Sequence, residues 1–190
     1  MISIKKIRQK RKINTIELRK NVLEIIGHII NDEDFLKLKL CRQHVFFNRY
    51  EHLLNVAVFV YKIAKFFKAD VQSCTLAGVL HDYHFTNYKT YEHGLVAASN
   101  SEKFGIDKKT KSIIESHMYP FGRKKIKRAK GKDFWIIKFA DSCCAIFEFL
   151  YSILFFSFNY KNKIKMKNNI LLLELNQQNQ QTINYVLSNK

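Results

Sequence analysis

The sequence contains very few of the residues that interrupt helices. Its 190 residues include one proline and six glycines, fewer than a β-rich or loop-rich domain of this size normally carries. Apolar residues make up 47% of the chain, enough for one domain with a substantial core. In five segments the apolar residues recur at the 3.6-residue spacing of an α-helix. We therefore expect a single domain that is almost entirely α-helical.

Capping residues and apolar spacing locate the expected helices. Asn14 with Glu17 resembles a helix start, and Asp70 and Asp107 are typical N-caps. A short helix is expected before Cys41, and one more within 170–187. The longer helices are expected to begin near Asn14, Arg49, Asp70, His93, Asp107 and Asp133.

The formal charge of +17 is large for a chain of this length. It is consistent with an anionic partner such as RNA, a nucleotide or a membrane surface. Biased codon usage is the alternative, because Lys, Asn, Ile and Phe are all frequent. The segment 121–132 is rich in Lys and Arg and is predicted to be an exposed loop.

Cysteine usage and hydropathy favour a cytoplasmic protein. The four cysteines form no CxxC pair, which favours reduced thiols, and no apolar signal region follows the basic N-terminus. The most apolar run, 143–158, contains Glu148 and is shorter than the ~20 residues of a membrane span. We expect it to be a buried helix, with no transmembrane segment.

Six histidines and aspartates are candidate metal ligands. His81 and Asp82 are adjacent at the end of an apolar run, and His52 lies on the inward face of its predicted helix. Each histidine alone fits a structural role equally well. Together, imidazole and carboxylate suit Zn, Mn, Fe, Co or Ni. The full set is His52, His81, Asp82, His93, His117 and Asp141.

The order of these residues, H…HD…H…H…D, resembles that of the HD-domain metal-dependent phosphohydrolase superfamily. The resemblance runs from about Gln43 to Glu148, and its pieces are Arg-Tyr-Glu-His at 49–52, Gly-Val-Leu-His-Asp at 78–82, His-Met-Tyr-Pro at 117–120 and Asp-Ser-Cys-Cys-Ala at 141–145. The chain looks most like small bacterial stand-alone HD proteins. It is also similar to HD-type diadenosine tetraphosphate hydrolases, which share the His-Gly element at His93.

The resemblance implies an all-α, single-domain HD-type helical bundle around a buried His/Asp metal site. It divides the chain into N-terminal helices packing on the core at 1–42, the HD domain at 43–158 and a polar helical tail at 159–190. Gln43 and His44 recur in the small HD proteins, which makes His44 a further, unassigned candidate for the site.

The family's ligands, carried over onto this sequence, imply two metal ions. His52, His81, Asp82 and Asp141 would hold the first, and His93 and His117 would add the second, with Asp82 bridging. The expected ions are divalent transition metals (Fe, Mn, Zn, Co or Ni), with Mg as a further option. Two such cations activate a water for attack on phosphorus, and Asp82 is expected to orient that water as the catalytic residue.

Substrate contacts are expected from cationic or polar side chains near the ligands. Arg49 precedes His52 by one helical turn, and Lys138 precedes Asp141 by three positions. Arg123 and Lys124 follow His117 closely. Many HD enzymes carry His-Asp-small-Gly-Lys; here the lysine is missing, and His84 is the candidate that replaces part of its contact. Lys138, Arg123 and Lys124 fit exposed lysines and arginines equally well.

Three functions remain open from the sequence. The leading prediction is an enzyme that cleaves a phosphoester or phosphoanhydride bond of a small phosphorylated substrate, a nucleotide or dinucleoside polyphosphate. The alternatives are an HD-type nuclease or RNA-binding protein, favoured by the +17 charge, and a non-catalytic metal-stabilised module. The sequence does not fix the metal, the substrate or the oligomeric state.

Overall fold

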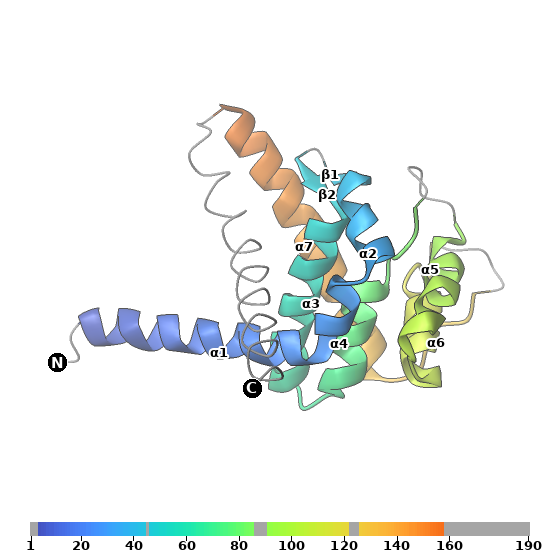
Figure 1. Cartoon of the computed structure of the whole chain (residues 1–190), viewed down its shortest axis with the longest axis horizontal. Helices are drawn as coiled ribbons and strands as arrows, with labels where there is room; N and C mark the ends of the chain where they lie inside the picture. Colours follow the sequence, from blue (N-terminus) through green and yellow to red (C-terminus); the bar gives the residue numbers. More distant parts are fainter. Residues whose placement is uncertain (1–3, 45, 86–90, 122–125, 158–190) are drawn as a thin grey trace, which may run out of the picture.

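The chain folds into a helical bundle (Figure 1). This computed structural model describes residues 4–44, 46–85, 91–121 and 126–157, without the side chains of 4–13 and 155–157. The described α-helices are α1 (Ile4–Ile30), α2 (Glu33–Lys37), α3 (Arg49–Phe66), α4 (Val71–Leu80), α5 (His93–Ser101), α6 (Lys108–Ser116) and α7 (Lys132–Ser157). Two 3₁₀ helices, η1 (Leu38–Leu40) and η2 (Glu102–Phe104), and two short strands, β1 (Arg42–His44) and β2 (Phe47–Asn48), complete them. The prediction of an all-α fold is confirmed.

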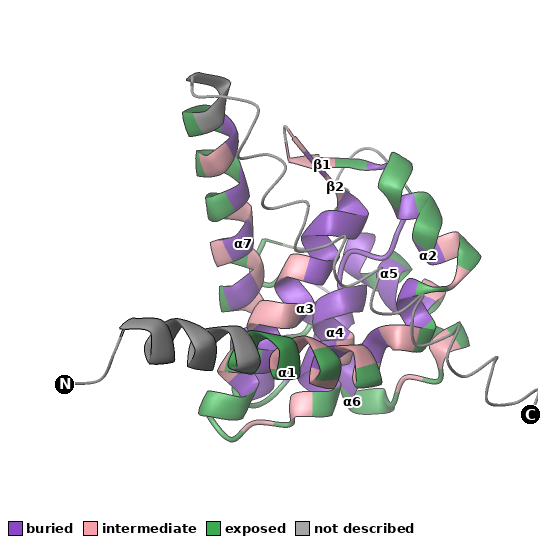
Figure 2. Cartoon of the chain, turned by 60° about the vertical axis from the view of Figure 1, so that its left-hand side comes forward, coloured by how far each residue is buried: buried purple, intermediate pink, exposed green. Residues whose placement is uncertain are grey.

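Helices α3 and α4 form the centre of the bundle, and α1, α7 and the α5–α6 pair surround them (Figures 1 and 2). Both central helices are buried over most of their length because their apolar residues cover more than one face. Gly78 allows them to approach closely: a Cβ there would lie 3.3 Å from the Cα of Ala57. This packing holds the ends of α3 and α4, which carry His52, His81 and Asp82, at a fixed separation.

The helix starts follow the predicted capping residues. Asp70 accepts a hydrogen bond from the Ser73 backbone N–H, and Asp107 accepts one from Thr110. Helix α3 begins at Arg49, with Asn48 and Glu51 forming a reciprocal capping box. Helix α5 begins at His93, as expected.

The predicted start of the first helix is wrong. Helix α1 begins at Ile4, so Asn14 lies inside it rather than at its N-cap. The preceding segment is rich in Lys, Arg and Gln, which favour helix, and one interior Asn costs less than ~1 kcal/mol. The C-terminal half of α1 docks through Val22, Ile26 and Ile29, all buried.

Helix α7 differs from the buried helix that was predicted. One face packs inward through Phe134, Ile137 and Ala140, but the opposite face is exposed. Among its outward side chains, Phe147 is 66% and Leu154 is 63% exposed. The run is apolar on all sides, and packing among the described residues buries only one of them. Within the described residues, none of the helices has the length and apolarity needed to cross a bilayer.

Two predictions concern parts of the chain that the described residues do not include. The polar tail, with its expected helix within 170–187, lies outside them, as do Arg123 and Lys124 of the basic loop. The only sheet in the described residues pairs β1 with β2 in antiparallel register, Arg42 opposite Asn48. The division at 42 and 158 stays a prediction.

Candidate metal centre

The six candidate ligands lie in two adjacent clusters of three. In the first cluster, His52 of α3, His81 after α4 and Asp141 of α7 each offer one donor atom, all within 4.8 Å of one another. The Oδ1 of Asp141 lies 3.2 Å from His52 Nε2 and 3.4 Å from His81 Nε2. Both histidines are fully buried, whereas the Asp141 side chain is 26% exposed.

The second cluster contains Asp82, His93 of α5 and His117 after α6. Asp82 Oδ1 lies 3.1 Å from His93 Nε2 and 3.3 Å from His117 Nε2, and the two Nε2 atoms are 2.9 Å apart. All three residues are buried. The clusters adjoin because His81 and Asp82 are consecutive residues, and the rings of His81 and His117 are 5.2 Å apart.

The spacing of the second cluster matches that of ligands around one cation. Two donors that each lie about 2.1 Å from a metal are roughly 3.0 Å apart at a bond angle of about 90° and roughly 3.4 Å apart at about 109°. The three separations, 2.9, 3.1 and 3.3 Å, fall at or near this range. Two imidazoles and one carboxylate also form a donor set typical of transition metals.

Hydrogen bonds at the Nδ1 atoms turn three of the imidazoles toward the clusters. His81 Nδ1 lies 2.9 Å from the Gly78 carbonyl, and His117 Nδ1 lies 2.7 Å from the Ile114 carbonyl. His52 Nδ1 lies 2.9 Å from the Glu148 carboxylate. An acceptor at Nδ1 places the proton there and leaves Nε2 as the metal-binding atom.

The buried polar atoms fit a cation better than they fit one another. Among the described residues, His81 Nε2 is buried and has no hydrogen-bond partner. Burial lowers the pKa of His117 despite the adjacent Asp82, so its Nε2 carries a lone pair at neutral pH. His93 Nε2 therefore faces a second imidazole nitrogen and a carboxylate oxygen with at most one proton to share. Such an electron-rich pocket is suited to a positive ion.

The electrostatic environment keeps both aspartates ionised. Burial tends to raise the pKa of Asp82, but the neighbouring imidazoles of His81, His117 and His93 hold it well below 3.8. The pKa of Asp141 is likewise held well below 3.8, with burial opposed by His81 and His52. Burial also acts to lower the pKa of His52, yet hydrogen bonds to Asp141 and Glu148 raise it to about 9.

The structure places Asp82 at the second cluster. We expected it to hold the first ion with His52, His81 and Asp141 and to bridge to a second ion; its Oδ1 lies with His93 and His117. Its Oδ2 accepts a hydrogen bond from Gln43 Nε2 at 2.9 Å. The bridging role stays a prediction.

Arg49 and His84, two predicted substrate contacts, belong to the same buried network. Arg49 Nε donates to Gln43 Oε1, and its Nη1 donates to the His84 carbonyl, 2.5 Å away. Arg49 is 1% exposed, and the Gln43 side chain links it to Asp82. Burial and the charge of Arg49 lower the pKa of His84 to about 4, so His84 is neutral at pH 7 and supplies no charge to a phosphate.

Lys138, the third predicted contact, lies beside the second cluster. Its Nζ donates to the His117 carbonyl at 3.0 Å and lies 5.4 Å from the centre of the Phe121 ring. Arg123 and Lys124 lie outside the described residues, so their predicted contacts remain predictions.

Two residues around the clusters were not predicted as part of the site. Gln43 links Arg49 to Asp82, and Glu148 contacts His52. Gln43 and Asp82 are 39 residues apart in the sequence, and His52 and Glu148 are 96 residues apart. The available signals were weak: Gln43 adjoins the candidate His44, and Glu148 follows Asp141 by seven positions on the same helix face. His44 does approach the site, since its ring lies 5.2 Å from that of His52.

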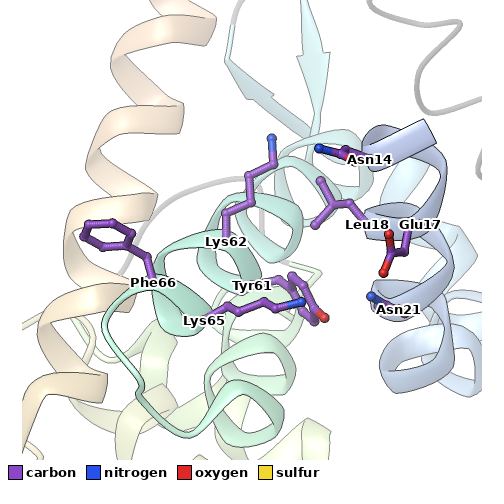
Figure 3. Close-up of a pocket in the computed structure, with 8 residues that line it drawn as sticks. All are labelled: Asn14, Glu17, Leu18, Asn21, Tyr61, Lys62, Lys65 and Phe66. Carbon is purple, nitrogen blue, oxygen red and sulfur yellow. The ribbon is translucent and has the colours of Figure 1, made fainter. Parts of the chain in front are cut away.

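One groove in the described structure lies away from these clusters (Figure 3). It is a groove of about 520 Å³ between α1 and α3, lined by residues that include Glu17, Tyr61 and Lys65. None of its lining residues belongs to either His/Asp cluster. We therefore place the candidate site at the clusters and not at this groove.

A helical bundle whose core encloses paired His/Asp clusters is the arrangement that the sequence resemblance implied. The family model described as HD domain matches residues 49–146, slightly more than half of the chain. The chain therefore belongs to the HD-domain superfamily of metal-dependent phosphohydrolases. This match covers all six candidate ligands.

A curated relative extends the comparison without naming a function. The chain is 33% identical over 84 residues to an uncharacterized protein of Methanocaldococcus jannaschii, covering 42% of this chain and 47% of the relative. The chain thus spans about half the length of that protein. No solved structure matches the chain.

Proposed function

We propose that this protein is a phosphohydrolase that uses two divalent cations to cleave a phosphoester or phosphoanhydride bond of a small phosphorylated substrate. A nucleotide or dinucleoside polyphosphate is the proposed substrate class. The observation that supports this most is the pair of adjoining clusters, each made of two imidazoles and one carboxylate. Membership of the HD-domain superfamily supports hydrolysis in general.

The chain's own residues would divide the work between the clusters. His52, His81 and Asp141 would hold one cation, and Asp82, His93 and His117 the other. Bound cations would activate a water and stabilise the charge that develops on the phosphoryl oxygens. Asp82 is ionised at neutral pH, so it can accept a hydrogen bond from a water beside it and orient that water.

The exposure of the ligands indicates where substrate would enter. Asp141 is 26% exposed, while the other five side chains are at most 3% exposed. Lys138 lies one turn before Asp141 on α7. We propose that phosphate approaches past Asp141 and Lys138, with Arg123 and Lys124 following the same entrance. Arg49 and His84 would then support Asp82 and Gln43 from the interior.

Metal content and a substrate screen test the proposal together. Chelator-treated protein would be reloaded anaerobically with Mn, Fe, Co or Mg and assayed on phosphomonoesters, phosphodiesters, nucleotides and dinucleoside polyphosphates. We expect about two ions per chain, falling to about one in His117→Ala with a large loss of turnover. His28→Ala, which removes an exposed histidine on α1, is the matched control and should behave as wild type. Unchanged metal content in a His81→Ala, Asp82→Ala double variant would refute the site.

Nucleic acid is a second candidate ligand because the chain carries a formal charge of +17. Neutralising phosphates releases counterions, so such binding must weaken steeply as salt rises. A binding constant for RNA that does not depend on salt concentration would remove this candidate. A steep dependence together with cleavage would identify a nuclease.

A further inference from the structure

Glu148 is a buried carboxylate of α7 that contacts one of the predicted metal ligands, His52. It lies two helical turns after Asp141, on the same side of the helix, and is 1% exposed. Its Oε2 lies 2.9 Å from His52 Nδ1, and its Oε1 accepts a hydrogen bond from Asn55 Nδ2 at 2.9 Å. An ionised carboxylate is costly to bury unless such partners offset the lost hydration.

The position of His52 within α3 explains why it needs a side-chain acceptor. His81 and His117 are the C-caps of α4 and α6, where the backbone carbonyls of the last turn, at Gly78 and Ile114, lie within reach of the Nδ1 atoms and accept from them. His52 is the fourth residue of α3, and the carbonyls around it take part in the helix. Its Nδ1 therefore needs an acceptor from outside α3, and Glu148 lies at that atom.

The carboxylate is itself held in place. Asn55 follows His52 by three positions, so both reach Glu148 from the same face of α3. His44 of β1 lies on another side, with its Nε2 3.7 Å from Glu148 Oε2. A carboxylate fixed by two residues of one helix cannot rotate without losing a contact, and His52 cannot rotate against it.

We propose that Glu148 is a positioning residue that holds His52 with Nε2 facing His81 and Asp141. This role rests on the proposed metal site. It means that Glu148 strengthens the binding of a cation by the first cluster. A hydrogen-bond acceptor behind a metal-binding imidazole orients the ring and raises its basicity, and its loss typically weakens metal binding about 10–100-fold.

The test measures cation affinity in metal-free protein carrying His117→Ala, so that the first cluster is the site titrated. Binding of Co²⁺ would be followed by its visible absorption, and thermal melting without metal would report stability separately. Glu148→Ala should weaken binding about 10–100-fold. Glu148→Gln, which keeps an oxygen acceptor, should recover most of that loss. Ser152→Ala, one turn further along the same buried face, is the control and should bind as the parent does.

The outcomes separate this role from the proposed function. The role would be overturned if Glu148→Ala binds the cation within twofold of the parent. It would also be overturned if the Ala and Gln variants lose equal affinity and each loss of affinity parallels a loss of thermal stability. If Glu148→Ala does not fold, Glu148→Gln and Asn55→Ala decide: a few-fold weaker binding with unchanged melting supports the role, and unchanged binding in both overturns it. Cobalt binding in the parent that His81→Ala leaves unchanged would instead refute the metal site itself.

Discussion

Gly94 lies where a single methyl group would disturb the second cluster without replacing any ligand. A Cβ built on Gly94 would lie 3.0 Å from His117 Nδ1 and 3.0 Å from the Ile114 carbonyl oxygen. These two atoms form the hydrogen bond that orients His117. The same Cβ would lie 2.9 Å from the Glu115 carbonyl oxygen. Gly94→Ala must therefore push the end of α6 and the His117 ring away from α5.

The size of the effect follows from these distances. Comfortable contacts to carbon begin at about 3.5 Å, so three atoms must each move by roughly half an ångström. Overpacking of this kind costs about 1–3 kcal/mol, and the better helix propensity of Ala returns up to about 1 kcal/mol. Net destabilisation should thus be about 0–3 kcal/mol. Displacing His117 should weaken the binding of the second cation about 10–100-fold, which corresponds to about 1.4–2.8 kcal/mol of binding free energy.

Calorimetric titration of metal-free protein with Mn²⁺ checks this prediction. Gly94→Ala should show one site as in wild type, the other weakened, and only a small change in melting temperature. Ala64→Val, which overpacks the buried end of α3 away from the ligands, is the matched control and should lower the melting temperature without changing either site. Wild-type affinity at both sites in Gly94→Ala would refute the account of the second cluster.

Three further predictions concern stability and reactivity. Hydrogen bonds from the Ser73 backbone and Lys109 lower the pKa of Asp70 from 3.8 to about 2; the stability from this charge is therefore present above about pH 4 and lost as pH falls toward 2. Asp70→Asn keeps a capping oxygen, so in urea unfolding it should be less stable than wild type at pH 7 and equally stable near pH 2. A stability difference that persists near pH 2 would show that the Asp70 charge is not its cause. Burial and the neighbouring Asp133 raise the pKa of the Cys74 thiol to about 12, so folded protein should resist alkylation at Cys74 at pH 8, as peptide mass spectrometry would show. Ile26→Ala should lower the free energy of unfolding by about 2–5 kcal/mol, because Ile26 is a buried contact of α1; a loss below ~1 kcal/mol would show that α1 is only loosely packed.

The parts of the fold that the sequence predicted well depend on local chemistry. The caps at Asp70 and Asp107 act within three residues, and the start of α5 at His93 follows a break in apolar spacing. The start of α1 was misplaced because Asn14 has the composition of a cap but lies within a segment of strong helix formers. Local signals compete, and propensity outweighed the cap there.

The candidate site shows the complementary limit. The ordered His and Asp residues, including His81 and His117, could be selected from the sequence, and the structure does bring all six together in two clusters. The division of the six residues into two clusters could not be predicted from the sequence. Asp82 lies with His93 because α5 packs against α4. The roles of Gln43 and Glu148 depend on contacts 39 and 96 residues apart, which no local pattern encodes.

The exposed face of α7 has a consequence for how the protein behaves in concentrated solution. From Ser142 to Leu154 the helix carries one ionisable carboxylate, Glu148, and that residue is buried. The outward face is thus neutral and apolar on a molecule with a formal charge of +17. At low ionic strength, mutual repulsion keeps molecules apart despite this face. Near 1 M salt the screening length shortens to about 3 Å, and apolar faces can meet. Light scattering should therefore show attraction growing as salt is added, so dilute buffer, rather than the usual high salt, is the better solvent for titrating metals into this chain.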